Sequence, residues 1–347
     1  MAQIPERVKS AALINTLLPL LLYQGKVRDT YDVDKFFRDT LLMVASDRIS
    51  IFDFVLNAVI PKKGEVLTAL THFWLTKVLS GYEHHLLESK KYEGRNLAFE
   101  MKYDSTGAMS TLADIPLERT LAIRRAKVMD HEMVFRHHIG GSVWKEYLEK
   151  GTAAGEPLPL GLKKWDKLEL PAFTPTTKAT DGHDLPETVK EFGQVAGMAG
   201  LMAAENLRHL YQIAYSYAAS KGILILDTKF EWGGMVVDEV LTPDSSRFVD
   251  KADWQAARAE KREPRFLDKE PIRIWGRGVP TPFRGKDGEY HLGINNLETE
   301  DADHLAFVHS LAVPDVVIAE ATDRYLEIFQ RLTGMELGEY QQVYLTL

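Results

Sequence analysis

Residues 223–248 hold charged side chains in a spacing that suits phosphate and metal chemistry. The stretch starts with four apolar residues, Ile223 to Leu226, which are typical of a buried strand. Polar and apolar residues then alternate, so Asp227, Lys229 and Glu231 share one face of the strand. One strand face therefore carries two acids with a lysine between them.

A hairpin turn follows the strand at Gly233-Gly234, a strong signal for a two-residue turn. This turn pairs Lys229 with Asp238 and makes Glu231 and Asp238 diagonal neighbours, roughly 7–8 Å apart at the backbone and closer at the carboxylates. Two carboxylates beside a lysine suit Mg²⁺, which usually takes one or two carboxylates together with substrate phosphates and water. The alternative is a solvated strand face on which the charges pair across the strands.

A second candidate is the string Gly25-Lys26-Val27-Arg28-Asp29. A glycine at a strand turn lets backbone N–H groups approach phosphate oxygens, and a neighbouring lysine adds a point charge. The string therefore predicts a phosphate-binding loop. The alternative is that Lys26 and Arg28 belong to a solvated strand face, because one glycine alone is no phosphate-loop fingerprint.

A third candidate is the polar stretch that follows the apolar run 40–45. Strand ends are a common place for substrate contacts, and the alternative is a turn whose side chains satisfy backbone donors. The polar residues of this stretch are Ser46, Asp47, Arg48, Ser50 and Asp53, and Lys63 follows them.

Two arginines and a serine could bind an anion. Arg136 lies near the end of an expected strand, and Ser142 lies at the expected N-cap of a helix over 143–150. A helix N-terminus offers free N–H donors and a favourable dipole to an anion. Arg247 carries a guanidinium that fits a phosphate or carboxylate with two parallel hydrogen bonds. Ordinary capping by Ser142 and a surface ion pair at Arg247 are the alternatives.

Composition excludes several classes of protein. The chain has 347 residues, of which 45% are hydrophobic and 27% charged, as in a globular protein. A formal net charge of −8 argues against general nucleic-acid binding. The absence of cysteine excludes disulfides, thiolate metal sites and thiol catalysis. We expect no signal peptide and no membrane span, and hence a cytoplasmic protein.

The strands and helices that must position these residues do not alternate strictly along the chain. This order favours an α+β fold over a doubly wound α/β fold. Strands are expected over 23–33, 40–45, 120–126 and 132–137, and helices over 6–18, 64–79, 143–150, 201–221 and 313–332. The stretch 151–194 is expected to be a long loop, and 250–300 to be irregular. We divide the chain into an N-terminal lobe, 1–126, and a larger lobe, 127–347.

Four strings in the chain resemble those of one enzyme family. Asp-Thr-Lys-Phe-Glu-Trp-Gly at 227–233 and Asp-Glu-Val-Leu-Thr-Pro-Asp-Ser-Ser-Arg-Phe at 238–248 are similar to the signature of SAICAR synthetase. Gly-Lys-Val-Arg-Asp at 25–29 matches the family's phosphate loop, and Ala-Ser-Asp-Arg-Ile-Ser-Ile-Phe-Asp at 45–53 is similar to a further family signature. The sequence departs from the family at Trp232, where phenylalanine is usual, and in a shorter link across the hairpin.

The resemblance implies a two-lobed α+β fold. A small N-terminal lobe with an antiparallel sheet would face a larger lobe similar to that of ATP-grasp enzymes, with the ATP cleft between them. The implied enzyme is an ATP-dependent ligase of de novo purine biosynthesis. It would join CAIR (5-aminoimidazole-4-carboxyribonucleotide) to L-aspartate and give SAICAR, ADP and phosphate, with ATP and Mg²⁺ as cofactors. By analogy with related ligases, CAIR would pass through an acyl phosphate.

The resemblance also implies roles for individual residues. Catalytic roles fall to Lys26, Lys229 and Arg247, and metal binding falls to Glu231 and Asp238. ATP binding falls to Gly25, Lys26, Val27, Arg28, Lys127, Met129, Lys229, Glu231 and Asp238. Substrate binding falls to Ser46, Asp47, Arg48, Ser50, Asp53, Lys63, Arg136, Ser142 and Arg247, with Arg247 on the 5′-phosphate of CAIR.

Two other functions compete with this one. A kinase-like phosphotransferase on the same two-lobed plan would need a His-Arg-Asp catalytic loop and an Asp-Phe-Gly metal site, and the sequence contains neither string. A non-catalytic nucleotide sensor would be favoured by loss of Lys26, Glu231 or Asp238, and all three are present. The expected partners are CAIR and L-aspartate, not nucleic acid or membrane, and the expected assembly is a monomer or homodimer.

Overall fold

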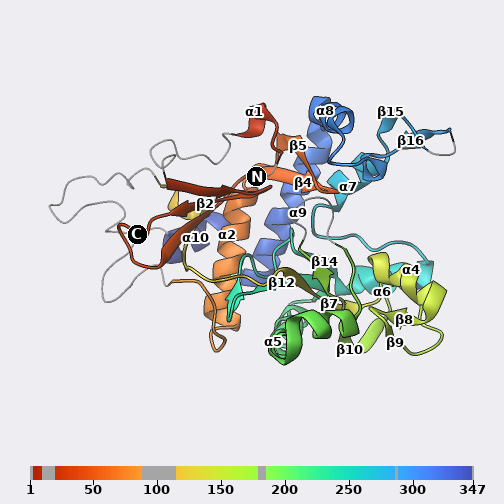
Figure 1. Cartoon of the computed structure of the whole chain (residues 1–347), viewed down its shortest axis with the longest axis horizontal. Coiled ribbons are helices and arrows are strands. Elements are labelled where there is room, and N and C mark those ends of the chain that lie inside the picture. Colours follow the sequence, from red (N-terminus) through yellow and green to blue (C-terminus); the bar gives the residue numbers. More distant parts are fainter. Residues whose placement is uncertain (1–2, 10–19, 88–114, 179–184, 286–287, 346–347) are drawn as a thin grey trace.

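The computed structural model shows an α+β fold of helices and antiparallel sheets (Figure 1), so the fold class expected from the sequence is confirmed. The described residues are 3–9, 20–87, 115–178, 185–285 and 288–345. Among them no single helix is long and apolar enough to cross a membrane. The helices α8 (Ala302–Ser310) and α9 (Asp315–Thr333) meet that test only together, as a pair bent by 87°.

A four-stranded antiparallel sheet forms the N-terminal part, in the order β1-β2-β3-β6. Its strands are β1 (Leu21–Gln24), β2 (Arg28–Asp32), β3 (Thr40–Ala45) and β6 (Thr120–Arg124). The single strand expected over 23–33 is wrong, because the chain turns at Gly25 and forms a hairpin between β1 and β2. A Cβ on Gly25 would lie 2.8 Å from the carbonyl oxygen of Arg28, so only glycine fits this turn.

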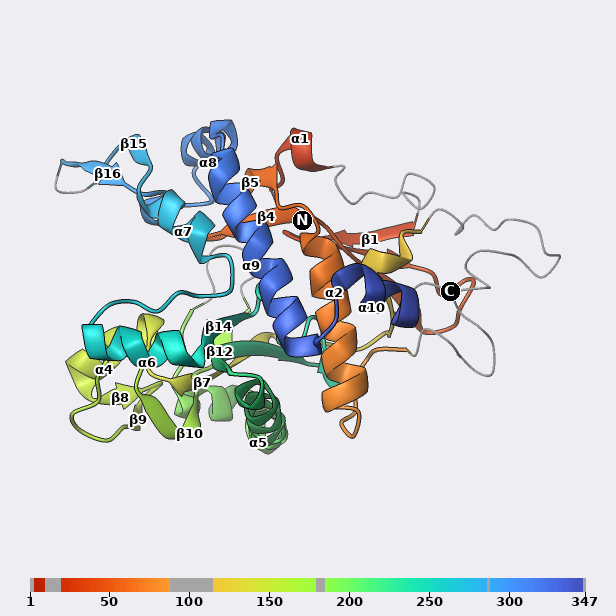
Figure 2. The same cartoon turned by 180° about the vertical axis from the view of Figure 1, so that it is seen from behind.

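A six-stranded antiparallel sheet forms the larger part, and β12 lies between β7 and β14 in it. Its strands are β7 (His131–His138), β10 (Lys167–Phe173), β11 (Thr176–Thr177), β12 (Ile223–Trp232), β13 (Val236–Val237) and β14 (Ser246–Asp250). One face packs on the long helix α5 (Val189–Ser220), as Figure 2 shows. Phe230 of β12 is fully buried in the apolar core, whereas Asp227 and Lys229 line a cavity, so the expected alternation is confirmed at these residues. Thr228, which was expected on the same face as Phe230, also lines the cavity.

The hairpin after β12 has a different register from the one expected. Glu231 lies opposite Val237, and the expected pairing of Lys229 with Asp238 is wrong. The turn holds three residues, 233–235, instead of two, because Met235 joins it and accepts a hydrogen bond from the N–H of Gly233 at 3.0 Å. As a result Asp238 has already left the strand, and it adopts a left-handed backbone conformation with φ of 62°.

Helices pack around both sheets and around a separate apolar cluster. The remaining helices are α1 (Glu6–Lys9), α2 (Lys63–Phe73), α4 (Gly141–Lys150), α6 (Lys251–Glu260), α7 (Glu270–Arg277) and α10 (Leu337–Tyr344), with short turns η2 (Trp74–Val78), η3 (Leu117–Arg119) and η4 (Ile294–Asn296). Short hairpins pair β4 (Arg48–Ile51) with β5 (Phe54–Val59), β8 (Thr152–Ala153) with β9 (Glu156–Pro157), and β15 (Pro280–Arg284) with β16 (Tyr290–Leu292). Helices α2 and α9 lie side by side (Figure 2), and the β4–β5 hairpin packs with α7 and α8.

Two stretches are more regular than the sequence indicated. The expected loop over 151–194 holds β8, β9, β10 and β11, and α5 already begins at Val189 behind a capping box of Thr188 and Glu191. Residues 250–300, expected to be irregular, hold α6, α7 and the β15–β16 hairpin. Strands of two or three residues carry too few side chains for a detectable alternation, which explains part of this difference.

The other expected elements are confirmed with shifted ends. The helices expected over 64–79, 201–221 and 313–332 correspond to α2 with η2, to the second half of α5 and to α9. The strands expected over 120–126 and 132–137 correspond to β6 and β7. The helix expected over 6–18 is described only as α1, and the rest of that expectation lies outside the described residues.

The division of the chain at residue 126 stays a prediction. The connection from β6 to β7 crosses this point, and the largest apolar core takes residues from both sides, among them Leu70 of α2, Phe135 of β7 and Phe329 of α9. Helices α9 and α10 pack against α2. The last helices of the chain therefore return to the N-terminal part and help to hold the two parts together.

Candidate functional site

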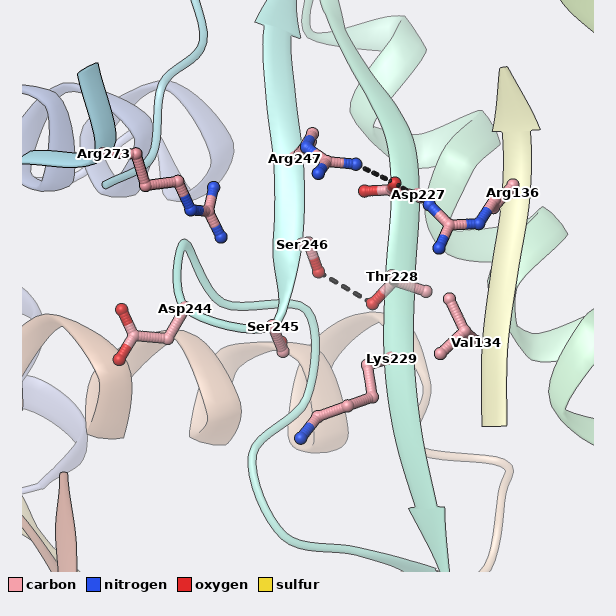
Figure 3. Close-up of a pocket in the computed structure, with 10 residues that line it drawn as sticks. All are labelled: Val134, Arg136, Asp227, Thr228, Lys229, Asp244, Ser245, Ser246, Arg247 and Arg273. Atoms are coloured by element: carbon pink, nitrogen blue, oxygen red, sulfur yellow. Dashed lines mark hydrogen bonds and ion pairs between the residues drawn. The ribbon is translucent and has the colours of Figure 1, made fainter. Parts of the chain in front are cut away.

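Three neighbouring strands, β7, β12 and β14, carry a cavity of about 150 Å³ (Figure 3). The lining residues are Val134, Arg136, Asp227, Thr228, Lys229, Asp244, Ser245, Ser246, Arg247 and Arg273. Three residues singled out in the sequence, Arg136, Lys229 and Arg247, therefore meet at one cavity although they come from three different strands.

Asp227 lies between two arginines in one row across the sheet (Figure 3). It faces Arg136 on β7 and Arg247 on β14 in the strand register. Its Oδ2 accepts a hydrogen bond from Nη1 of Arg136 at 2.7 Å and another from Nη1 of Arg247. Burial lowers the pKa of Arg136 and repulsion from Arg247 adds to this, whereas Asp227 opposes it. Two guanidinium groups share one carboxylate, which leaves a surplus positive charge for an anion.

The N-terminus of α4 lies beside the same two guanidinium groups. A Cβ on Gly141 would lie 3.3 Å from Nη1 of Arg247 and 3.6 Å from Nη1 of Arg136. The expected N-cap at Ser142 is wrong, because α4 starts at Gly141 and the cap is Gly140. Ser142 lies instead within the first turn, where its N–H is one of the helix's free donors. Free N–H groups and two arginines together form a suitable site for a phosphate.

Four residues further along β12 the charge is reversed. Oε2 of Glu231 lies 2.6 Å from Nζ of Lys178, and Oδ2 of Asp238 lies 2.7 Å from Nη2 of Arg28. Burial raises the pKa of Asp238 and the negative charge of Glu231 adds to this, whereas Arg28 opposes it. The two carboxylates therefore repel each other across the hairpin, and a shared cation would relieve that repulsion.

Lys229 lies between two groups of charged residues. The first is the row of Arg136, Asp227 and Arg247, called the cationic row below, and the second is Glu231 with Asp238, called the acidic pair. Nζ of Lys229 lies 2.5 Å from Oε1 of Glu132 on β7. Burial alone would lower the pKa of Lys229, but Glu132 and the acidic pair raise it above its usual value. Lys229 therefore stays protonated at neutral pH and provides a fixed positive charge at the centre of the site.

The acidic pair fits a magnesium ion that is held mainly by a phosphate ligand. Among the described residues, no group of three or more histidine or acidic side chains is arranged as a metal site. Glu231 and Asp238 supply two carboxylates, and Mg²⁺ commonly takes one or two carboxylates with phosphate oxygens and water. Each carboxylate holds a cationic side chain, Lys178 or Arg28, so a metal at this pair has to displace or share these contacts.

The turn between β1 and β2 reaches the acidic pair through Arg28. Its Nη1 lies 2.9 Å from Oε2 of Glu239, beside the contact with Asp238. Burial alone would lower the pKa of Arg28, but these two acids outweigh it and raise the pKa. Lys26 makes a different contact, 2.7 Å from Oδ1 of Asp53, and its side chain is 45% exposed. Lys26 is thus accessible to a ligand, whereas Arg28 is engaged by the hairpin.

Arg48 and Ser46 hold the same turn from the inside. Arg48 is fully buried, and its guanidinium donates to Asp29 at 2.5 Å and to the carbonyls of residues 25 and 26 at 3.1 and 3.2 Å. The hydroxyl of Ser46 donates to the carbonyl of Val27 at 2.8 Å. These contacts explain both residues as supports of the turn, and their direct contact with a substrate stays a prediction.

Asp47 and Lys63 lie at the start of α2. Oδ1 of Asp47 accepts a hydrogen bond from the N–H of Gly64 at 2.8 Å, which satisfies one of the free donors of that helix. Lys63 is fully buried, with Nζ 2.7 Å from Oδ2 of Asp244, a residue of the cavity. Ser50 is buried in β4 and is not one of the residues that line the cavity. Lys63 therefore reaches the cavity through Asp244.

Asp244 also receives groups from the C-terminal helices. The hydroxyl of Tyr325 donates to its Oδ1, and Nζ of Lys269 lies 4.0 Å away. Burial lowers the pKa of Lys269 to about 8. Arg273 lines the cavity, and its Nη1 lies 3.3 Å from Oδ2 of Asp268. Arg273 of α7 thus forms part of the cavity wall, and α9 supports that wall through the contact of Tyr325 with Asp244.

The connection between β6 and β7 touches the hairpin. The N–H of Met129 donates a hydrogen bond to the carbonyl of Trp232 at 2.8 Å. Lys127, in the same connection, is exposed. These contacts connect the segment to the acidic end of β12. Contact of Lys127 and Met129 with ATP stays a prediction.

Several residues of the site were missing from the sequence-based set. Asp227 shares the alternating face of Lys229 and Glu231, and that alternation is a signal that could have found it. Asp244 lies inside the string at 238–248, so its neighbours in sequence also pointed to it. Glu132 enters through pairing with another strand, and no local pattern marks it.

Comparison with known proteins gives one consistent family. A model of the SAICAR synthetase family matches residues 21–287. A phosphoribosylaminoimidazole-succinocarboxamide synthase from Rhodopirellula baltica is 35% identical over 94% of this chain and 96% of its own length. The solved structure of SAICAR-synthase from Saccharomyces cerevisiae complexed with SAICAR has a TM-score of 0.71 and 30% identity, over 93% of this chain and 97% of that one. A SAICAR synthetase in complex with ADP is similar in fold. It has a TM-score of 0.55 and 20% identity, over 90% of this chain and 98% of that one.

Proposed function

The chain belongs to the SAICAR synthetase family and is an ATP-dependent ligase of purine biosynthesis, and from this premise we propose which residues bind each ligand. The substrates are CAIR and L-aspartate. The row of Arg136 and Arg247 with the N-terminus of α4 binds the 5′-phosphate of CAIR. The acidic pair of Glu231 and Asp238 binds Mg²⁺ with the phosphates of ATP. SAICAR in the yeast structure and ADP in the second structure support these ligand classes.

The observation that carries this proposal is the reversal of charge along β12. Asp227 is outnumbered by two arginines, whereas Glu231 and Asp238 repel each other four or more residues further on. A phosphate binds best where positive charge is in surplus, and a metal–phosphate complex binds best where carboxylates are in surplus. The reacting carboxylate of CAIR then lies between the two ends, near Lys229.

The chemical problem is that a carboxylate is a poor electrophile. We infer that the γ-phosphoryl group of ATP is transferred to a carboxylate oxygen of CAIR, with ADP as the leaving group. The amine of L-aspartate then attacks the acyl carbon, phosphate leaves, and the amine's proton is released to solvent. No protein nucleophile is needed, so the site has to position three anions and neutralise their charge. Lys229, with its raised pKa, provides such a charge at neutral pH.

Magnesium at the acidic pair would neutralise charge on the phosphates of ATP during transfer. Lys178 forms an ion pair with Glu231, and Arg28 forms one with Asp238. Lys178 is the more exposed of these two cations, at 40% against 16% for Arg28. We propose that Lys178 turns from Glu231 toward the ATP phosphates when the metal binds, while Arg28 keeps the turn and the hairpin together. Lys26, exposed in the same turn, contacts the same phosphates.

The ATP cleft then lies between the N-terminal lobe, 1–126, and the larger lobe, 127–347. The ion pair of Arg28 with Asp238 supports this place for the cleft, because it brings a turn of the first part next to the hairpin of the second. The cytoplasm remains the proposed location, and a monomer or homodimer remains the proposed assembly.

One assay tests the proposal directly. ADP release is measured with CAIR and L-aspartate together, with each alone, and with neither. We expect rapid release only with both substrates and Mg²⁺, together with formation of SAICAR. ADP release that needs a different acceptor, and no SAICAR, would contradict the proposed reaction.

A further inference from the structure

We propose that Trp165 is a positioning residue for the phosphate end of the site, where its indole holds Arg247 and the start of α4 in one arrangement. The inference rests on the proposed binding of the CAIR 5′-phosphate by Arg247. Trp165 lies outside the strings that pointed to the function. It belongs to the connection between the β8–β9 hairpin and β10.

Trp165 is fixed by its own backbone and by its ring nitrogen. Its N–H donates to the carbonyl of Ile139 at 2.6 Å, and its carbonyl accepts a hydrogen bond from Nε1 of Trp254 at 3.0 Å. Its indole Nε1 donates to Oε2 of Glu263 at 2.6 Å. The residue has a φ of 67° and is only 6% exposed. A left-handed backbone costs free energy for a tryptophan, so these surrounding contacts must hold it there.

The ring packs directly on the chain that leads into α4. A Cβ on Gly140 would lie only 1.9 Å from Cζ3 of Trp165, so the indole occupies the space of a side chain at that position. The backbone of Gly140 is extended, with φ of −162°, a conformation that alanine also adopts. Glycine is therefore required at position 140 by the indole and not by the backbone angle.

The same ring lies against Arg247. The guanidinium carbon of Arg247 is 5.8 Å from the centre of the indole, within the range of a cation–π contact. Nη1 of Arg247 lies near Gly141 and bonds to Asp227. Trp165 thus touches both parts of the phosphate site, the arginine and the helix start. It touches neither Glu231 nor Asp238 among the contacts of the described residues.

This placement predicts an effect on one ligand only. A guanidinium held in one plane loses less freedom when it forms two hydrogen bonds to a phosphate, so removal of the ring should weaken CAIR binding. The loss should be roughly tenfold, the size of one cation–π contact in a partly buried site. The dissociation constant for Mg–ATP should not change, because the acidic pair is separate from the indole.

The test is to measure CAIR and Mg–ATP binding by calorimetry, and KM and kcat for CAIR, in Trp165→Leu and Trp165→Phe. We expect Trp165→Leu to raise the Kd and KM for CAIR about tenfold with little change in kcat, and Trp165→Phe, which keeps an aromatic face, to stay within about twofold of the parent enzyme. Trp254→Leu removes the hydrogen bond to the Trp165 carbonyl but leaves the Trp165 indole in place, so it should raise the Kd for CAIR by less than Trp165→Leu does.

The contact with Gly140 supplies a second measurement that does not depend on CAIR. Gly140→Ala should lower the melting temperature by several degrees in the parent and hardly at all in a Trp165→Ala background, since the clash is then gone. Equal effects in both backgrounds would overturn the packing argument. A normal Kd for CAIR in Trp165→Leu, with a weakened Kd in Arg247→Lys, would overturn the positioning role and leave the proposed function intact. Unchanged CAIR binding in Arg247→Lys as well would instead refute the phosphate assignment itself.

Discussion

The two ends of the proposed site along β12 are held in opposite ways. At the first end, Asp227 is fixed by the register of three strands, because Arg136 and Arg247 lie directly opposite it on either side. At the second end, Glu231 and Asp238 meet through a three-residue turn, and Asp238 is already outside the ladder with φ of 62°. Rigid pairing suits a phosphate of fixed shape, whereas a turn allows small movements around a metal–phosphate complex.

The comparison also shows that local charge, not net charge, decides what a site can bind. The chain carries a formal net charge of −8, yet the row around Asp227 has a surplus of positive charge. The acidic pair is close enough to raise the pKa of Asp238 through repulsion in addition to burial. Lys229, between the two ends, separates these opposite environments along one strand.

The largest expected effect comes from removing charge at the acidic end. Glu231→Gln or Asp238→Asn should abolish Mg²⁺-dependent turnover, with a loss on the order of 3–4 kcal/mol in the barrier, because a charged metal ligand is removed from a phosphoryl-transfer site. Stopped assays of ADP release give kcat, and thermal melts report the fold. Glu205→Gln, an exposed glutamate on α5, is the matched control. Near-normal turnover in both site variants would mean that the metal binds elsewhere.

The next effect is expected at the cationic end. Arg247→Lys keeps the charge but loses the planar two-pronged contact, so CAIR binding should weaken by about 1.5–3 kcal/mol, as for a hydrogen bond to a charged group. Calorimetry with CAIR and with Mg–ATP separately measures both affinities. Arg265→Lys, an exposed arginine, should change neither. A defect confined to ATP would place Arg247 on the nucleotide phosphates instead.

A smaller effect with two opposite signs is expected for Lys178→Met. Without the lysine, Glu231 loses its counter-charge, so free Mn²⁺ should bind about fivefold more tightly, while ATP should bind about fivefold more weakly. Each change is roughly 1 kcal/mol, as for an ion pair whose lysine is partly exposed. Electron paramagnetic resonance of Mn²⁺ and calorimetry with Mg–ATP measure the two constants. Lys251→Met on α6 serves as the control. Changes of the same sign for metal and ATP would contradict the proposed exchange of Lys178 between the two.

The smallest effect is a pH dependence from Lys269. Burial lowers its pKa from 10.5 to about 8, so in the folded chain its charge is present below pH 8 and is lost as pH rises through 8. CAIR binding should therefore weaken above about pH 8, since one positive charge leaves the wall that contains Asp244 and Arg273. Between about pH 8 and 10.5 the unfolded chain binds the extra proton, so this group makes stability rise with pH.

The control for this prediction is Lys269→Arg, because an arginine keeps its charge throughout this range. Titration of CAIR by calorimetry from pH 6.5 to 9.5 should show the alkaline loss in the parent and not in the variant. An identical pH profile in both would mean that Lys269 does not affect the cavity.

The sequence was sufficient to predict the site residues that lie within one contiguous segment of the chain. The strings at 25–29 and 227–248 placed Arg28, Glu231 and Arg247 near the site, and the alternation after Leu226 gave the correct faces of β12. The register of the hairpin was wrong because a glycine pair does not reveal that Met235 also enters the turn. A shift of the register by one residue changes every cross-strand neighbour, so the expected pairing of Lys229 with Asp238 was wrong.

Contacts between distant segments could not be predicted from one sequence. Arg28 and Asp238 are 210 positions apart, and Lys63 meets Asp244 only because α2 packs beside the C-terminal helices. The fit of the Trp165 indole on Gly140 likewise depends on tertiary packing and leaves no pattern in either segment. Local sequence thus indicated the chemistry, and packing determined which residues support it.

The most direct test of the division between the two ends is a crossed titration. CAIR and Mg–ATP are each titrated by calorimetry into the parent enzyme, Arg247→Lys and Glu231→Gln. We predict that Arg247→Lys loses affinity for CAIR alone and that Glu231→Gln loses affinity for Mg–ATP alone. Loss of the same ligand in both variants would show that the two ends form one binding site and would contradict the account.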